Sequence, residues 1–292
     1  MKNPYLTLGT LKSTLRAFEL RPSREMGQNF LFDGAVLAQI VAAAELQPDQ
    51  TVIEVGPGFG VLTWELVQQA RDVIAVELDK RLVEHLQGAF ATTPNLKIIQ
   101  NDILRVPPAE LLQNTATEHY KVVANLPYAI TSPALRHFLE ADHKPDLIVV
   151  LVQWEVAERI TAQVGDLSML AHAIQMYAEP AIVAKVGRES FYPAPVVDSA
   201  ILRLRIRPQP AVDVDNIEQL MRVIKAGFLH ARKTLSNALP SGLAAMGQRV
   251  TRDQVLAALH SAGVDPQRRA ETVTLPEWAM IYRTLSGDGV TG

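Results

Sequence analysis

Short apolar runs alternate with amphipathic stretches through the first two thirds of the chain. The apolar runs cover residues 51–55, 73–77, 96–100, 121–124 and 146–152. Between them, apolar residues recur at helical spacing, as in residues 62–69, 81–90 and 134–141. Short strands that alternate with helices are typical of a parallel sheet with helices on both faces. The pattern therefore predicts an α/β domain.

The pattern changes towards the end of this region. Residues 182–186 form another apolar run, and in residues 197–207 apolar positions alternate with three arginines. The alternation predicts a strand at an edge of the sheet, antiparallel, whose arginines we expect to face solvent first and RNA second. Pro208 and Pro210 then disfavour continued helix or strand, so we place a domain boundary there.

The remaining sequence predicts helices. Amphipathic stretches cover residues 217–228, 232–239, 252–261 and 275–285. Asp215 and Glu218 stand at the beginning of the first of them with the spacing of a helix start. We therefore expect three parts: an N-terminal arm of residues 1–30, an α/β domain of residues 31–210, and a small all-helical domain of residues 211–292.

The composition excludes several classes of chemistry. The 292 residues include no cysteine, which rules out disulfides, thiolate catalysis and cysteine-ligated zinc. The seven histidines show no ligand spacing, so we predict no metal site. The longest wholly apolar run, residues 147–152, is too short to span a membrane, and no secretory signal is visible. We expect a soluble, cytoplasmic protein.

The charge distribution limits how a nucleic acid could bind. The net charge is -3 at pH 7, so the molecule as a whole is not a basic nucleic-acid binder. Residues 1–30 nevertheless carry five Lys and Arg against two acids, and residues 215–292 carry nine against seven. A nucleic acid would therefore be held by local patches near the two ends of the chain.

A glycine-rich turn follows the first strand of the predicted sheet. Glycine lets the backbone turn tightly and approach a ligand closely. The dinucleotide fingerprint needs a glycine where Val61 stands, and a phosphate-binding loop needs Gly-Lys-Ser/Thr, which is absent. Glu54-x-Gly56-x-Gly58-x-Gly60 instead resembles the first motif of S-adenosylmethionine-dependent methyltransferases. A tight turn without a ligand is the alternative for this loop alone.

Acidic residues stand at the ends of the next two predicted strands. Glu77 ends one of them, where a carboxylate can accept hydrogen bonds from the two hydroxyls of a ribose. Asp102 follows the other, where it can accept from an adenine amino group. One such acid is often only a turn residue. Two acids at the ends of consecutive strands, after a glycine turn, favour a ligand that contains adenosine.

The segment Asn125-Leu126-Pro127-Tyr128 follows the fourth strand. It resembles the motif of amino-methyltransferases in its Asn-Leu/Ile-Pro-Tyr/Phe form. The amino group of adenine is a poor nucleophile because its lone pair is delocalised into the ring. The Asn125 side-chain oxygen and the Leu126 carbonyl can accept hydrogen bonds from this amino group. Pro127 stiffens the loop, and Tyr128 offers a ring on which the base can stack. A common turn with a buried aromatic residue is the alternative.

Together these motifs are similar to those of the KsgA/RsmA family of small-subunit ribosomal RNA adenine dimethyltransferases. The resemblance extends over residues 24–285, with further matching segments at residues 27–31, 165–168, 191–200, 232–237 and 269–272. It implies a Rossmann-like S-adenosylmethionine-dependent methyltransferase domain with a mostly parallel seven-stranded sheet, an antiparallel edge strand and a small C-terminal helical domain.

The resemblance also implies a reaction. The protein would dimethylate N6 of two adjacent adenosines in a hairpin loop near the 3′ end of 16S rRNA, in the assembling small ribosomal subunit. S-adenosyl-L-methionine is the implied cofactor, the arm would close over cofactor and RNA, and we expect a monomer. The residues assigned to the cofactor are Gln28, Asn29, Leu31, Gly56, Gly58, Glu77, Leu78, Asp102, Ile103 and Asn125.

The assignment of RNA contacts rests mainly on the family resemblance. The residues assigned to RNA are Tyr128, Phe191, Arg232 and Lys233. For Phe191, a wall of the base pocket and packing of a rigid loop on the sheet are equally open, and Trp154 is expected in the core. Ala231 and Val196 stand where the family usually has arginine and lysine, which removes charge from the expected RNA surface.

Three other functions stay open. A related resistance methyltransferase modifies 23S rRNA, but the developed helical tail favours the small-subunit enzyme. A DNA adenine methyltransferase is less favoured, because that class usually has proline where Leu126 stands. A non-catalytic RNA-binding ribosome assembly factor would keep the fold without the reaction, although Glu77, Asp102 and Asn125 indicate retained catalysis.

Overall fold

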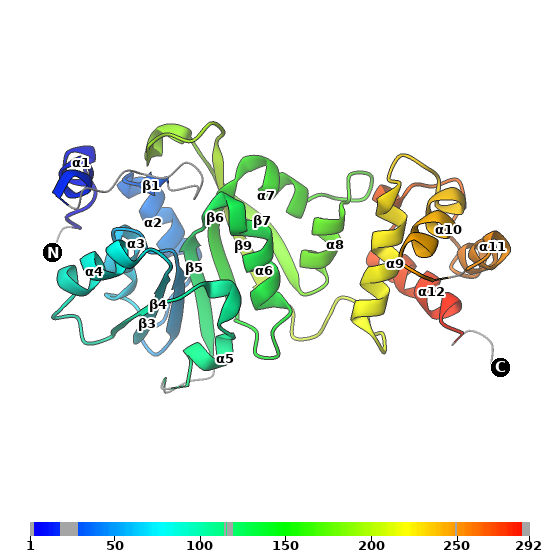
Figure 1. Cartoon of the computed structure of the whole chain (residues 1–292), viewed down its shortest axis with the longest axis horizontal. Coiled ribbons are helices and arrows are strands. Elements are labelled where there is room, and N and C mark those ends of the chain that lie inside the picture. Colours follow the sequence, from blue (N-terminus) through cyan, green and yellow to red (C-terminus); the bar gives the residue numbers. More distant parts are fainter. Residues whose placement is uncertain (1–2, 18–28, 114, 116–118, 249, 288–292) are drawn as a thin grey trace. The chain divides into compact units, whose positions relative to one another are not determined.

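A seven-stranded sheet forms the framework of the α/β part of the chain (Figure 1). The computed structural model describes residues 3–17, 29–113, 115, 119–248 and 250–287. The strand order is β4-β3-β2-β5-β6-β9-β7, in which β2 to β6 are parallel and β9 is antiparallel to β6. The strands are β2 (Thr51–Val55), β3 (Asp72–Glu77), β4 (Leu96–Gln100), β5 (Tyr120–Asn125), β6 (Leu147–Gln153), β7 (Ala178–Val186) and β9 (Ser199–Ile206).

The last strand in sequence is not where its pattern predicts. The five predicted parallel strands are confirmed to within one residue, and β9 is antiparallel as expected. However, β9 lies between β6 and β7, so β7 and not β9 is the edge strand. Arg203 and Arg205 of β9 are partly exposed to solvent, as expected, and both also bind the carboxylate of Glu45, at 3.1 and 2.9 Å.

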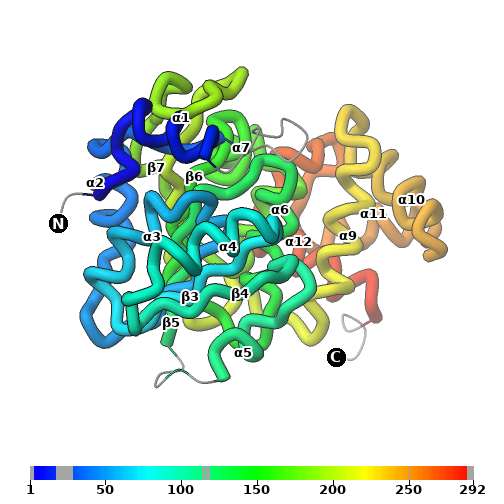
Figure 2. Tube along the Cα trace, turned by 60° about the vertical axis from the view of Figure 1, so that its left-hand side comes forward, coloured from blue at the N-terminus to red at the C-terminus, as the bar shows by residue number. Residues whose placement is uncertain are grey.

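Helices cover both faces of this sheet. In Figure 1, α2, α3 and α4 lie on one side of the strands and α6 on the other, and Figure 2 shows α3 and α4 in front of the sheet. Asp33 caps α2, and Asp79 caps α4, by accepting backbone hydrogen bonds in the first turn. The helices are α1 (Leu8–Ala17), α2 (Gly34–Ala43), α3 (Val61–Leu66), α4 (Lys80–Ala89), α5 (Pro108–Leu111), α6 (Thr131–Leu139) and α7 (Trp154–Ile160).

The far end of α2 is held by cations from the sheet. The buried amine of Lys121, on β5, donates to the carbonyls of Ala44 and Glu45 at 2.9 and 2.6 Å. With the two arginines on Glu45, this satisfies carbonyl groups that a helix end leaves without partners. The helix that precedes the first strand of the sheet is thereby fixed against it.

A two-stranded sheet joins the start of the α/β part to its end. β1 (Phe30–Leu31) pairs antiparallel with β8 (Phe191–Tyr192), and Leu31 lies opposite Phe191. Phe191 is only 3% exposed and belongs to the hydrophobic core. Trp154, expected in the core, is instead half-buried, because its ring lies on the surface under the amine of Lys185, 4.9 Å from the ring centroid.

The chain divides into two compact units, residues 1–157 with 180–206, and residues 158–179 with 207–292. The second unit begins its longer segment at the predicted break, and it also contains α8, which precedes that break. Its core surrounds the buried Trp278. Its helices are α8 (Met169–Gln175), α9 (Ile217–Leu229), α10 (Leu235–Ala245), α11 (Arg252–Ser261) and α12 (Leu275–Leu285).

Two of the segments that carry the resemblance meet inside this second unit. The backbone N–H groups of Gly165 and Leu167 both donate to the carbonyl of Glu271 at 3.1 Å. The ring nitrogens of the buried His172 lie 2.9 Å from the carbonyls of Ser168 and Val273. These segments therefore have a structural task, because they attach α8 to the other helices of the unit.

Candidate active site

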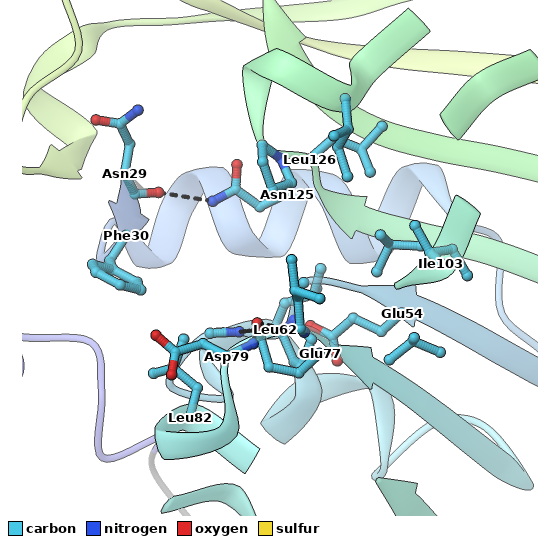
Figure 3. A pocket seen from close by; sticks show the side chains of 18 of the residues that line it. Asn29, Phe30, Glu54, Leu62, Glu77, Asp79, Leu82, Ile103, Asn125 and Leu126 are labelled. Carbon is cyan, nitrogen blue, oxygen red and sulfur yellow. Dashed lines mark hydrogen bonds between the residues drawn. The ribbon is translucent and has the colours of Figure 1, made fainter. Parts of the chain in front are cut away.

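A cavity of about 290 Å³ lies at the carboxyl ends of the parallel strands, within the first unit (Figure 3). Its lining comes from the ends of β2 and β3, from the loops after β4 and β5, and from residues 29–31. β2 has β3 on one side and β5 on the other, so the strand order reverses there. Ligands of open α/β sheets bind at such a switch point.

Glu77 holds the glycine turn in place. Its carboxylate accepts hydrogen bonds from the backbone N–H groups of Gly58, Leu78 and Asp79 at 3.1, 2.9 and 3.0 Å. Gly58 has φ 59, and a Cβ atom there would lie 3.1 Å from the ring of Phe30. Burial raises the pKa of Glu77, while these N–H groups oppose the rise. Oε2 accepts one of the three bonds, so it keeps capacity for a ligand hydroxyl.

Asp102 stands after β4, at the other acidic position predicted from the sequence. One of its oxygens accepts from the backbone N–H of Leu104 at 3.0 Å, which caps a short 3-10 helix, Ile103–Arg105. The other oxygen lies 3.6 Å from the Arg105 guanidinium, and the side chain is 34% exposed. Asp102 is therefore ordered, yet open to a ligand. Ile103 and the exposed Leu78 add apolar surface to the same cavity.

Asn125 is fixed by the main chain of the arm. Its Nδ2 donates to the carbonyl of Asn29 at 3.1 Å, as Figure 3 shows. Because the nitrogen is engaged there, Oδ1 is the acceptor that this side chain offers to a ligand. The next residue, Leu126, donates its backbone N–H to Leu151 on β6 at 3.3 Å, which holds the loop to the sheet.

Tyr128 is held from the far end of its ring. Its phenol oxygen lies 2.8 Å from the hydroxyl of Ser199, which is fully buried at the start of β9. The Tyr128 side chain lines the cavity and is half-buried, and this burial raises the pKa of its phenol. The phenol thus stays protonated at neutral pH, and the hydrogen bond fixes the plane of the ring.

The structure brings most of the predicted residues into this one cavity. All the residues assigned to the cofactor line it except Gln28, which lies outside the described residues. Phe191 does not line it, and its burial fits packing of the loop on the sheet. Arg232 and Lys233 are exposed and belong to the second unit.

Other lining residues have no assigned role in the sequence prediction. Glu54, quoted above only as the first residue of the glycine motif, lines the cavity from a buried strand, where an acid among Val and Ile is the signal that points to it. Asp79 also lines the cavity and doubles as the cap of α4. Phe30 packs its ring 4.7 Å from that of Phe59, a contact for which the local sequence holds no signal.

Neither a metal site nor a membrane-spanning helix is found in the part of the chain that the structure describes. Within those residues, no three His, Asp or Glu side chains gather as a metal site. None of the helices in the same ranges is long and apolar enough to cross a membrane.

Known proteins are similar to this chain over nearly its full length. Ribosomal RNA small subunit methyltransferase A of Dehalococcoides mccartyi is 48% identical over 92% of this chain and 90% of its own length. The same protein of Moorella thermoacetica is 40% identical, with 96% and 98% covered. The crystal structure of the 23S rRNA methyltransferase ErmE is 32% identical, with 88% and 100% covered and a TM-score of 0.68.

A second solved structure shares the fold at lower identity. A dimethyladenosine transferase from Plasmodium falciparum is 24% identical, with 89% of this chain and 98% of its own covered and a TM-score of 0.74. The predicted fold class, a methyltransferase-type sheet followed by a helical part, is confirmed. The family model described as ribosomal RNA adenine dimethylase matches residues 20–286. The chain therefore belongs to the ribosomal RNA adenine dimethylase family.

Proposed function

We propose that this protein dimethylates N6 of two adjacent adenosines near the 3′ end of 16S rRNA, in the small ribosomal subunit or its precursor. S-adenosyl-L-methionine is the proposed methyl donor. The observation that carries the proposal is the Asn125 side chain, whose nitrogen is engaged by the Asn29 carbonyl and whose oxygen is left to accept from an amino group. The small-subunit names of the relatives at 48% and 40% identity support the choice of substrate.

The charge of the cavity fits this cofactor and not a dinucleotide. Four lining residues are acidic, Glu54, Glu77, Asp79 and Asp102, and none of the described lining residues is Lys, Arg or His. The pyrophosphate of a dinucleotide would be repelled by the ionised carboxylates of this set. S-adenosylmethionine has no phosphate and carries a net positive charge, so the same carboxylates attract it.

Each part of the cofactor has a candidate partner. Glu77, through Oε2, would accept from the ribose, and Asp102 from the adenine amino group. Leu78 and Ile103 supply apolar surface for the adenine ring. Gly56 and Gly58 line the cavity with backbone and no side chain, so the amino-acid part could lie close to the turn.

The residues of the chain prepare the nucleophile. When bound, S-adenosylmethionine supplies a methyl group on a positively charged sulfur. Asn125 Oδ1 and the Leu126 carbonyl would accept from the two N–H groups of adenine N6, which favours a tetrahedral nitrogen with its lone pair free. The Asn125 oxygen needs little reorganisation, because the Asn29 carbonyl already holds its amide. Tyr128 would stack on the extruded base.

The rest of the chain would bind and enclose the substrate. We propose that residues 1–30 close over cofactor and RNA, that residues 211–292 form an RNA-binding helical part, and that the protein acts as a cytoplasmic monomer. Arg232 and Lys233, which are exposed just before α10, would contact phosphates. Such contacts should weaken as salt rises.

The decisive experiment offers the protein several nucleic acids. Labelled S-adenosylmethionine would be incubated with unmethylated small ribosomal subunits, large subunits and duplex DNA, and the modified nucleoside identified. We expect dimethyladenosine on small-subunit RNA alone. Label on large-subunit RNA would favour the activity named for ErmE, the structural neighbour at 32% identity. Bound cofactor without label on any RNA would mean a non-catalytic assembly factor.

The hydroxyl and the ring of Tyr128 should contribute separately. Tyr128→Phe removes the bond to Ser199 and should lower kcat/KM by about two- to tenfold, the value of one hydrogen bond. Tyr128→Ala also removes the stacking surface, worth about 1–3 kcal/mol, and should lower it by a further factor of about five to one hundred. The measurement is kcat/KM on small subunits. Equal losses in the two variants would show that the ring does not stack on the base.

A further inference from the structure

Glu54 is a buried acid in the cavity that the proposed reaction does not use. It stands on β2, is 1% exposed, and lines the cavity floor beside Glu77 (Figure 3). The hydroxyl of Thr63, from α3, donates to its Oε2 at 2.6 Å. A neutral threonine does not balance a negative charge, so an ionised Glu54 has no cation among the described lining residues.

The surroundings of Glu54 favour its protonated form in the empty cavity. Burial and, less strongly, the neighbouring Glu77 raise the pKa of Glu54 to about 8. The other titratable groups along the lining are Asp79, Asp102 and Tyr128, and none of them supplies a positive charge. Near pH 7 the empty cavity therefore holds Glu54 mostly as the neutral acid.

The two forms of the proposed cofactor differ by one unit of charge. S-adenosylmethionine has a sulfonium, an ammonium and a carboxylate group, so its net charge is positive. Its by-product, S-adenosylhomocysteine, has a neutral thioether and no net charge. Both ligands carry an ammonium and a carboxylate, so the difference is the sulfonium. Its positive charge stabilises the ionised form of a nearby carboxyl and lowers its pKa, and the by-product lacks this effect.

We propose that Glu54 is the residue by which this cavity distinguishes the cationic cofactor from its neutral by-product. Glu54 gives up its proton to solvent when S-adenosylmethionine binds, and it stays protonated when S-adenosylhomocysteine occupies the same place. The by-product thus loses an attraction that the cofactor had, which favours its release after each transfer. This inference rests on the proposed function, because it takes S-adenosylmethionine as the ligand.

The first test measures protons and not methyl transfer. Isothermal titration calorimetry at pH 7, in buffers with different enthalpies of ionisation, gives the number of protons exchanged on binding. We expect release of a fraction of one proton with S-adenosylmethionine and none with S-adenosylhomocysteine. Between pH 7 and 8.5 the Kd of S-adenosylmethionine should fall roughly three- to eightfold, because ionising Glu54 no longer opposes binding above its free pKa.

Two variants locate the effect. Glu54→Gln keeps an acceptor for Thr63 but cannot ionise, so it should abolish the proton release and the pH dependence, and bring the two Kd values closer together. Asp79→Asn removes another carboxylate of the same cavity, one that caps α4 and has no assigned cofactor contact, and the proton release should persist in it. The wild-type measurements stand on their own if a variant does not fold.

The outcomes separate this inference from the proposed function. Cofactor binding without proton release, or release that survives in Glu54→Gln, would overturn the role of Glu54 and leave the methyltransferase intact. If neither adenosyl ligand binds the wild-type protein, the proposed function itself fails.

Discussion

Asn125→Ala should lower the rate of methyl transfer by about a hundredfold or more, while S-adenosylmethionine still binds. The variant removes the preorganised acceptor that we propose for the reacting amino group, and groups of this kind are worth about 10² to 10³ in rate. We expect the cofactor to be held mainly by other lining residues, among them Glu77 and Asp102, which the substitution does not touch. Single-turnover methyl transfer to small subunits, together with calorimetric binding of the cofactor, measures the two effects apart.

The matched control is Asn101→Ala. Asn101 lines the same cavity, but its side chain accepts from the backbone N–H of Asp102 and is not part of the loop after β5. We expect a much smaller loss of rate in this variant. If the two variants lose rate equally, or if the loss in Asn125→Ala follows a loss of cofactor binding, then Asn125 does not act on the nucleophile.

Gly242→Ala should destabilise the helical unit by about 1–3 kcal/mol or more. Gly242 lies inside α10, and a Cβ atom there would stand 2.1 Å from the backbone carbonyl oxygen of Ala226 on α9. A backbone atom cannot rotate away as a side chain can, so the two helices must separate. Hydrogen exchange of the amides of α9 and α10, and urea denaturation of the whole chain, would report the loss.

A second helical glycine provides the control for this variant. Gly88 lies in α4, and a Cβ atom there would have no neighbour within 4 Å. Gly88→Ala should therefore leave stability unchanged or raise it by up to about 1 kcal/mol, because alanine favours the helix. Unaltered amide protection in α9 and α10 of Gly242→Ala would mean that these helices do not pack as closely as the structure has them.

Much of the candidate site could be predicted from local sequence, because the fold itself brings local motifs together. The glycine turn and Asp102 follow parallel strands, Glu77 and Asn125 end parallel strands, and the carboxyl ends of parallel strands meet at one edge of the sheet. Strand periodicity and turn residues are therefore sufficient to place these side chains near each other. Their individual hydrogen bonds did not have to be known.

The contacts that fix these side chains could not be predicted in this way. The partners of Asn125 and Tyr128 are Asn29 and Ser199, 96 and 71 positions away, and no local pattern links such pairs. The position of β9 inside the sheet could not be predicted for a related reason. Alternating arginines look the same whether they face water or a single distant acid, here Glu45. The strand at Phe191 has only two residues, which is too few to show the alternation typical of a strand.

These two hydrogen bonds join residues that are far apart in the sequence, and this determines when the site can form during synthesis. Asn125 needs the carbonyl of Asn29, and Tyr128 needs the hydroxyl of Ser199, so the complete site requires the chain from residue 29 to residue 199. A nascent chain is made from its N-terminus, and domains form as units once their residues are available. In a chain still growing through β6, Tyr128, the residue proposed to receive the base, would lack its anchor until β9 leaves the ribosome.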